Sequence, residues 1–400
     1  MTNIAILGFG TVGSGVAQVL TDNREIIRQR IASNYSIKYI LDLRDFPDSP
    51  FADLITHDFD RIIHDPDVTV VAEMMGGSHP AYEFTKACLE AGKSVVSSNK
   101  EVVANFGPEL LATAKTNHVS YLFEASVGGG IPIITTLGQD LAANRILSVS
   151  GILNGTTNYI LTRMEQDGMA FADALADAQS LGYAERNPSA DIQGLDAARK
   201  IAILAAMAYG KMIPVESVLT EGIAEITKDD IILAKELGFT LKLIGHATCE
   251  DGKLLAMVTP RFVPQASPLA GVNDVFNAVL VRADMLGDSM YYGRGAGKLP
   301  TASAVCADIL SVIRNSGSSP MPDWADASED ELMPLEDYAC RNCFIFSGKD
   351  FRAEKYFEPQ KLSCDGELTA AVSPRMTEKD AMRIEQEADP LFVKRFRILD

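Results

Sequence analysis

The chain is poor in positive charge. Its 400 residues carry 36 Lys and Arg against 54 Asp and Glu, which gives a formal net charge of −18. Because nucleic-acid binding needs a basic surface to meet the phosphates, this balance argues against a nucleic-acid partner. It favours a protein that handles small molecules.

Long apolar runs are also missing. No stretch approaches the roughly 18 consecutive apolar residues of a membrane-spanning helix. Residues 3–7 form a short strand-like segment, without the basic-then-apolar pattern of a secretory leader. We therefore expect no membrane partner and no signal peptide.

Cysteine is scarce. The six cysteines are scattered along the chain, which is not the pattern of a disulfide framework and predicts a reducing, cytoplasmic location. Only Cys340 and Cys343 have zinc-like spacing. A structural zinc site needs four ligands, and no second Cys or His pair follows them.

What the sequence does contain is alternation of strands and helices. Apolar segments that read as buried strands occupy residues 3–7, 37–41, 67–75, 94–98 and 119–125. Helical stretches separate them, as in an open parallel sheet with helices on both faces. We predict an α/β fold whose first part is a Rossmann-type, doubly wound parallel sheet. Ligands of such sheets bind at the carboxyl ends of the strands.

Residues 8–13, GFGTVG, follow the first expected strand and precede a helical stretch. That setting is where GxGxxG binds a dinucleotide. The first glycine allows the tight turn, the second lets a pyrophosphate approach the backbone, and the third lets helix and strand pack closely. The alternative is a tight turn without a ligand. The expected cofactor contacts are Gly8, Phe9, Gly10, Thr11, Val12 and Gly13.

Two further strand ends point toward the same cofactor. The strand 37–41 runs into Asp42, Arg44 and Asp45, where an acid would bind the ribose of NAD and an Arg the 2′-phosphate of NADP. Both residue types are present, so the choice between NAD and NADP stays open. Lys100 follows the strand 94–98 and is expected to face the cofactor crevice, unless it is a plain surface lysine.

The stretch 182–200, GYAERNPSADIQGLDAARK, concentrates charged and polar residues directly before residues 201–208, which are apolar on every face. A helix that is apolar all round is buried. Asp196 and Lys200 lie four residues apart and therefore share one helix face. A Lys held by an Asp at the end of a buried helix is a candidate proton donor. The alternative is an exposed ion pair without a function.

A second domain of α+β type is expected to follow the first, for substrate binding and dimerisation. A strand at 146–153 leads into a polar loop, 154–158, at the start of a helix. That loop suits a small anionic group or supplies helix caps. The glycine-rich residues 292–300 precede a helix, 301–313, that we expect to return to the first domain. Gly297 is a candidate cofactor contact in this loop.

These motifs together resemble those of the homoserine dehydrogenases. The resemblance covers residues 1 to about 313 and rests on GFGTVGSGV, SSNK, EASVGGGIP, GILNGTTNYIL, GYAERNPSADIQGLDAARK and GRGAGKLPTA. It implies NAD(P)-dependent interconversion of L-homoserine and L-aspartate 4-semialdehyde, on the route to threonine and methionine. It also implies a homodimer or a dimer of dimers.

The resemblance assigns roles to particular residues. Lys200 would donate a proton to the developing alkoxide, and Asp196 would position Lys200. Lys100 would lie between cofactor and substrate. The substrate-binding residues would be Glu185, Tyr183, Thr156 and Asp191. A sodium ion would be held, mostly through backbone carbonyls, at Glu124, Val127, Gly129 and Ile131; the alternative is a glycine turn without an ion.

Two other classes of function compete with this one. An acylating semialdehyde dehydrogenase would need a nucleophilic Cys with a His base, and neither Cys88 nor Cys249, with His246 nearby, lies in such a motif. A non-catalytic protein that senses a dinucleotide would keep the glycine loop but would not need Asp196 and Lys200.

The organisation that we predict is a Rossmann domain at 1–132, a substrate and dimerisation domain at 133–313, an acidic linker at 314–337 and a small α+β appendage at 338–400. The appendage has the position of a regulatory ACT domain, but only one convincing helix, 377–388, where such a domain has two. We expect a degenerate ACT-like appendage that buries its strands 343–346 and 392–399 against the subunit or a second copy.

Overall fold

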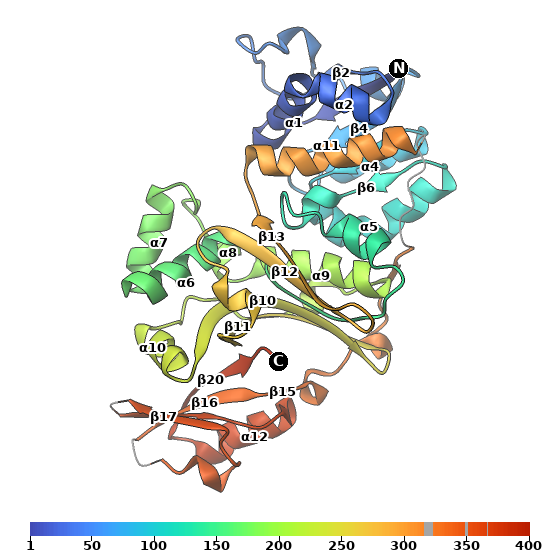
Figure 1. Cartoon of the computed structure of the whole chain (residues 1–400). Coiled ribbons are helices and arrows are strands. Elements are labelled where there is room, and N and C mark those ends of the chain that lie inside the picture. Colours follow the sequence, from blue (N-terminus) through green and yellow to red (C-terminus); the bar gives the residue numbers. More distant parts are fainter. Residues whose placement is uncertain (316–322, 349–350, 366) are drawn as a thin grey trace.

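The computed structural model describes residues 1–315, 323–348, 351–365 and 367–400. Three parts follow one another along the long axis of the molecule (Figure 1): an N-terminal α/β part, a central part around a strongly curved sheet, and a C-terminal α+β part. No helix in the described residues has both the length and the apolar character needed to cross a membrane. Residues 316–322, within the expected linker, lie outside the described residues.

The N-terminal part is a six-stranded, all-parallel sheet in the order β3-β2-β1-β4-β5-β6. This is the strand order of a Rossmann fold, as predicted. Its strands are β1 (Thr2–Leu7), β2 (Tyr35–Leu41), β3 (Ile55–Thr56), β4 (Val68–Glu73), β5 (Ser94–Ser97) and β6 (Tyr121–Leu122). Its helices are α1 (Thr11–Asp22), α2 (Arg24–Ile31), α3 (Asp60–Ile63), α4 (Ala81–Glu90) and α5 (Lys100–Thr116).

The side chains of β1 point alternately to the two faces of this sheet, and helices cover both faces. Ile4 and Ile6 belong to the apolar cluster that contains α1, whereas Ala5 and Leu7 belong to the cluster that contains α4 and α5. Successive side chains of a strand point to opposite faces, so a short apolar strand buries both sides. The late helix α11 (Lys298–Arg314) packs on α1.

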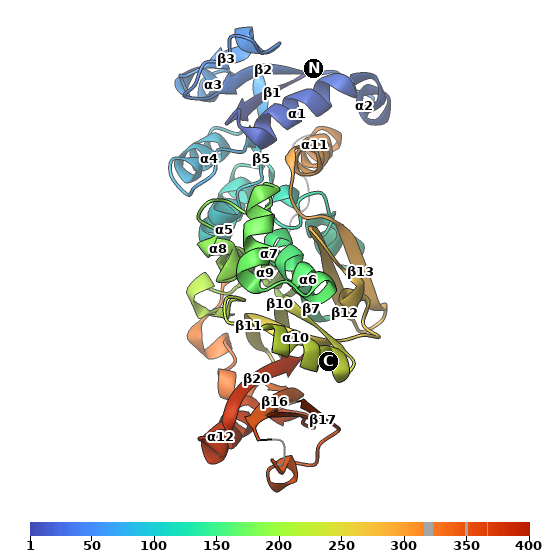
Figure 2. The ribbon, with the colours of Figure 1, turned by 90° about the vertical axis from the view of Figure 1, so that its left-hand side faces the viewer.

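The central part contains a mixed sheet in the order β13-β12-β7-β10-β11, which continues into the C-terminal strands. Helix α9 lies between this sheet and the parallel sheet, and helices α6 and α7 lie at one side of it (Figure 1 and Figure 2). The strands are β7 (Ile146–Ile152), β10 (Phe239–Glu250), β11 (Lys253–Pro264), β12 (Phe276–Ala283) and β13 (Gly287–Arg294). The helices are α6 (Gly155–Asp167), α7 (Phe171–Ser180), α8 (Ser189–Ile192), α9 (Leu195–Tyr209) and α10 (Lys228–Glu236).

The C-terminal part is joined to the central sheet. β20 (Phe392–Ile398) pairs in parallel with β11, and Phe396 stacks on Phe262 with ring centroids 4.7 Å apart. The appendage therefore buries its last strand against the body of the subunit, one of the two partners that we expected. It adds β16 (Asn342–Ser347), β17 (Lys361–Asp365) and β18 (Leu368–Val372), with α12 (Glu378–Ala388) as the one α-helix in its described residues. The strands β17 and β18 were not predicted.

Several local expectations were wrong. The predicted strand 119–125 is only β6, because the chain turns into a 3₁₀ turn at Glu124–Ser126. Residues 134–140 are helical, and the last five of them, Thr136–Asp140, form a π-helical turn. The first residues of the glycine-rich stretch 292–300 belong to β13.

The acidic segment before the appendage is not a solvated linker in its described residues, 323–337. Trp324 is 7% exposed and packs against Phe123, with ring centroids 5.2 Å apart. A short strand, β14 (Ala325–Asp326), pairs with β8 (Lys211–Met212), and Glu331 pairs with Lys211. Charge composition alone predicted a linker, but one buried aromatic side chain and a strand pairing dock the segment.

Candidate functional site

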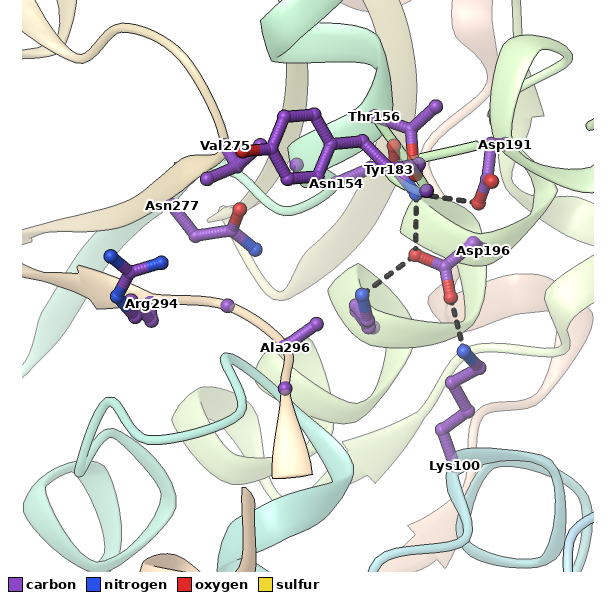
Figure 3. A pocket seen from close by; sticks show the side chains of 15 residues that line it. Lys100, Asn154, Thr156, Tyr183, Asp191, Asp196, Val275, Asn277, Arg294 and Ala296 are labelled. Atoms are coloured by element: carbon purple, nitrogen blue, oxygen red, sulfur yellow. Dashed lines mark hydrogen bonds and ion pairs between the residues drawn. The ribbon is translucent and has the colours of Figure 1, made fainter. Parts of the chain in front are cut away.

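The central cavity has a volume of about 400 Å³ and lies between the parallel sheet and the mixed sheet. Its walls come from the starts of three helices, α5, α6 and α9, from β12 and from the turn 294–297. Figure 3 shows the side chains that face it. The cavity gathers residues from both parts of the chain, as expected of a site that brings a cofactor and a substrate together.

Helix α9 explains why an acid and a lysine lie at this cavity. Gly194 has a φ of +83°, so the chain turns sharply just before the helix begins at Leu195. Asp196 falls in the first turn, where the helix dipole favours a carboxylate. The run 201–206 is buried throughout, which anchors the helix and holds Lys200 at the cavity wall.

Asp196 forms ion pairs with two lysines. Its Oδ2 lies 2.6 Å from the Nζ of Lys200, and its Oδ1 contacts the Nζ of Lys100. Lys200 also donates to the backbone carbonyl of Leu153 at 2.8 Å. Asp196 and Lys200 are 5% and 9% exposed, so the pair is not the exposed ion pair that the alternative interpretation required.

Burial and charge shift the ionisation of this pair. Burial alone would raise the pKa of Asp196, but Lys200 and Lys100 outweigh it and hold the pKa below its usual range. Burial lowers the pKa of Lys200 below its ordinary 10.5, although Asp196 opposes part of that shift. A lysine of lowered pKa, held in place by a carboxylate, is suited to exchange a proton with a ligand.

Asn154 connects the Asp196–Lys200 pair to a second acid, Asp191. Its Nδ2 donates to Asp191 at 2.8 Å and to Asp196 at 3.0 Å, while its Oδ1 accepts the backbone N–H of Thr157 and so caps α6. Burial raises the pKa of Asp191. The polar loop at 154–158 therefore supplies both a helix cap and a cavity wall.

The expected substrate-binding residues are only partly brought together. Thr156 donates to the carbonyl of Tyr183 at 2.6 Å, and both residues line the cavity with Asp191. Glu185 is exposed and is not among the residues that line the cavity.

The glycine turn has the geometry that a dinucleotide requires. A Cβ at Gly13 would fall 1.9 Å from the carbonyl oxygen of Gly8, so only glycine lets α1 pack this closely on β1. A Cβ at Gly10 would meet only the tip of Arg44, at 4.0 Å, which leaves open space over the turn. No side chain caps α1, whose backbone N–H groups therefore stay available for a phosphate.

Asp42 and Arg44 form one unit at the end of β2. The carboxylate of Asp42 accepts the backbone N–H of Phe9 at 2.7 Å and pairs with the Nε of Arg44 at 3.0 Å. Burial would raise the pKa of Asp42, but the bonds from Arg44 and Phe9 lower it to about 2. Asp42 thus faces the glycine turn. Asp45 contacts His57 instead.

The turn at 124–131 is buried except at Gly130, and backbone N–H groups bind its one carboxylate. The carboxylate of Glu124 accepts the backbone N–H groups of Ile133, Ile134 and Thr135 at 2.7–2.8 Å. Nowhere in the described residues do three or more His, Cys, Asp or Glu side chains gather as a metal site, at Cys340 and Cys343 included. A cation here would therefore depend on backbone carbonyls.

Among the side chains that the structure describes, no Cys–His pair supports an acylating mechanism. Cys88 is buried, and burial raises its pKa to about 12. Burial also raises the pKa of Cys249, while His246 shares a hydrogen bond with Ser150 at 2.9 Å. A catalytic cysteine needs a lowered pKa.

Sequence reasoning missed two residues that line the cavity, Asn277 and Arg294. Each lies in a β-strand of the second part of the chain. Nothing local in the sequence marks them, although Arg294 stands within the glycine-rich stretch that we had singled out.

A Rossmann sheet with a glycine turn, and a cavity that presents a buried lysine beside it, define a nicotinamide-dependent oxidoreductase. Comparison with known proteins narrows this class. Residues 8–124 match the family model "Homoserine dehydrogenase, NAD binding domain", and residues 132–310 match the model "Homoserine dehydrogenase".

Individual relatives agree with the family models. The chain is 42% identical to the homoserine dehydrogenase of Bacillus subtilis over 316 residues, 78% of this chain and 73% of the relative. It superposes on the crystal structure of a homoserine dehydrogenase from Thiobacillus denitrificans with a TM-score of 0.91, 34% identity, and coverage of 100% and 98% of the two chains. A hyperthermophilic archaeal homoserine dehydrogenase mutant in complex with NADPH is similar over 78% of this chain and 97% of its own, with 29% identity and a TM-score of 0.67.

The chain belongs to the homoserine dehydrogenase family. Members of this family are NAD(P)-dependent oxidoreductases that act on the CH–OH group of homoserine.

Proposed function

We propose that the cavity interconverts L-homoserine and L-aspartate 4-semialdehyde, with Lys200 as the group that exchanges the proton. The observation that carries this proposal is the buried Lys200–Asp196 pair at the cavity wall. A nicotinamide cofactor, when bound, takes up or supplies the hydride.

The chemistry places two demands on Lys200. When the aldehyde is reduced, negative charge develops on its oxygen, and an adjacent ammonium both stabilises that charge and donates a proton. When homoserine is oxidised, the same nitrogen must accept the hydroxyl proton. The lowered pKa of Lys200 brings both protonation states within reach near neutral pH more readily than an exposed lysine would allow.

Asp196 acts as the positioning residue of this pair. It fixes the Nζ of Lys200 between its own carboxylate and the carbonyl of Leu153. Lys100 approaches the same carboxylate from α5, which Asn99 caps by accepting the N–H groups of Glu101 and Val102. Lys100 thus connects the parallel sheet to α9 and adds positive charge next to the substrate.

The amino-acid end of the substrate is assigned to a second group of residues at the cavity. Thr156, Tyr183 and Asp191 line it, and a carboxylate such as Asp191 is a partner for an ammonium group. Glu185 belongs to the same proposal, although its contact would require the exposed loop that carries it to close over the cavity.

For the cofactor we propose a preference for NADP, carried by Arg44. Its side chain is 64% exposed beside the glycine turn, and an arginine binds a 2′-phosphate with bidentate geometry. Because the carboxylate of Asp42 already forms an ion pair with Arg44, it is less available to bind ribose hydroxyls.

We further propose a monovalent cation, such as sodium, at the turn 124–131. The backbone carbonyls of Glu124, Val127, Gly129 and Ile131 would hold it, since oxygen ligands suit such hard ions. In support, all four residues are buried, so water is excluded there. Replacing sodium by choline in the buffer tests the idea: we expect a lower melting temperature, and no change would contradict the site.

A homodimer or dimer of dimers, and a role in threonine and methionine synthesis in the cytoplasm, complete the proposal. The location rests on the cysteines, since the five whose side chains the structure describes are unpaired. The assembly is tested by light scattering during gel filtration.

The activity itself is tested by mixing the purified protein with homoserine and NADP or NAD and following the absorbance of the reduced nicotinamide. We expect a steady increase with homoserine and none with other primary alcohols of similar size.

A further inference from the structure

The side chain of Asn277 lies at the cavity wall and has no hydrogen-bond partner in the described part of the chain. It stands near the start of β12, is 1% exposed and faces the cavity (Figure 3). Neither its Oδ1 nor its Nδ2 has a hydrogen-bond partner in the described part of the chain. Buried polar side chains are nearly always bonded, so an orphaned amide at a ligand cavity indicates that the partner is a ligand.

Two glycines pack directly against the amide of Asn277. A Cβ at Gly295 would fall 2.0 Å from its Nδ2, and a Cβ at Gly155 would lie 3.6 Å from its Oδ1. Glycine at these two positions therefore lets the turn 294–297 and the start of α6 pass close by, without a side chain over the amide. Any other residue at position 295 would push Asn277 out of place.

The chemistry of the orphaned amide selects its partner. A primary amide offers one acceptor and one donor group side by side, and its best complement is a second primary amide, with two parallel hydrogen bonds. The charged ends of an amino-acid substrate are better matched by the charged groups of the same cavity, among them Asp191 and Arg294. The neutral amide is left for a neutral ligand group.

We propose that Asn277 binds the carboxamide of the nicotinamide ring through a pair of hydrogen bonds. Its Nδ2 donates to the carboxamide oxygen, and its Oδ1 accepts from the carboxamide nitrogen. Fixing the carboxamide stops the ring from rotating and keeps one face turned toward the substrate beside Lys200. This rests on the function proposed above, because it requires a nicotinamide cofactor in the cavity.

The test compares two cofactors on three proteins. The cofactors are NADPH and its 3-acetylpyridine analogue, in which a methyl group replaces the carboxamide nitrogen. The proteins are the full-length wild type, Asn277→Ala, and the matched control Asn105→Ala, which alters an exposed asparagine on α5. Dissociation constants are measured by calorimetry without turnover.

We expect the wild type and the control to bind the analogue at least about fivefold more weakly than NADPH, because one amide atom then stays unsatisfied. In Asn277→Ala, NADPH binding weakens, and the ratio of the dissociation constants of the analogue and NADPH falls toward one. Asn277→Asp, which keeps the acceptor and loses the donor, provides a second variant if the alanine protein does not fold.

Three outcomes overturn the proposal. The preference for NADPH could persist unchanged in Asn277→Ala. The KM for homoserine could rise while the cofactor preference stays the same, which would assign the amide to the substrate. The melting temperature could fall while both cofactors bind as before, which would make Asn277 a structural residue. Since binding needs no turnover, a wild type that fails to oxidise homoserine counts against the proposed function and leaves this test intact.

Discussion

Asp196 holds Lys200 from one helical turn away, with 2.6 Å between its Oδ2 and the lysine Nζ, and its other oxygen contacts Lys100. One buried carboxylate thus orders two ammonium groups that come from different parts of the chain. Without it, the two lysines would repel each other. The geometry makes Asp196 the residue on which the positions of both lysines depend.

Asp196→Asn is therefore expected to lower kcat by at least about tenfold, because Lys200 loses its anionic partner and its position. The KM for the cofactor should change little. Steady-state kinetics with homoserine measures both. Asp173→Asn, at an exposed position in α7, is the control and should behave like the wild type. A kcat of Asp196→Asn within threefold of the wild type would show that Asp196 does not position the lysine.

The pH dependence should follow the ionisation of Lys200. Aldehyde reduction needs the protonated amine, so its rate falls as pH rises through the pKa of Lys200; homoserine oxidation needs the neutral amine, so its rate rises over the same interval. Burial places that midpoint below 10.5. In Asp196→Asn the midpoint moves lower still, since the charge that favours the ammonium is gone. Kinetics in both directions measures the midpoints, and identical midpoints in wild type and variant would count against this assignment.

Arg44→Ala should reduce kcat/KM with NADP by about tenfold or more and affect NAD far less, because the loss of a phosphate-binding arginine matters only to the phosphorylated cofactor. Comparing kcat/KM for both cofactors, on wild type and variant, decides this. A strong preference for NAD in the wild type would show instead that Asp42 or Asp45 governs the pocket.

The sequence predicted some parts of this site because the chemistry is local there. The glycine turn and the Asp196–Lys200 pair each lie within one short segment, where spacing fixes geometry. Asn277 was not predicted, because its role depends on where β12 lies in the sheet and on which glycines pass beside it. The strands β17 and β18 were not predicted either, because a small appendage that shares a sheet with the body needs no strong hydrophobic pattern of its own.

Spacing in the sequence also could not predict the long-range contacts of the C-terminal part. Within it, Glu378, which is 1% exposed, joins α12 to β20 by pairing with Arg395 and Arg397 at 2.9 and 2.8 Å. Glu378→Gln would leave both arginines short of a buried counter-charge, at a cost of about 3–5 kcal/mol. Urea unfolding measures the loss, with the exposed Glu387→Gln as the control. A loss below about 1 kcal/mol would show that the network contributes little to stability.

We also expect threonine to inhibit the enzyme weakly or not at all, because the appendage has one α-helix in its described residues and serves to extend the sheet. The measurement is the initial rate against threonine for the full-length chain and for a chain ended near residue 317. The shorter chain exposes Phe262 on β11 and should lose stability. Strong inhibition of the full chain that disappears on truncation would restore a regulatory role.

The most direct test of the central claim is the kcat of Lys200→Ala for homoserine oxidation, followed by the absorbance of the reduced nicotinamide, with cofactor binding measured in parallel. If Lys200 exchanges the proton, kcat falls at least about a hundredfold while the dissociation constant for the cofactor stays near that of the wild type. A kcat within threefold of the wild type would contradict the account.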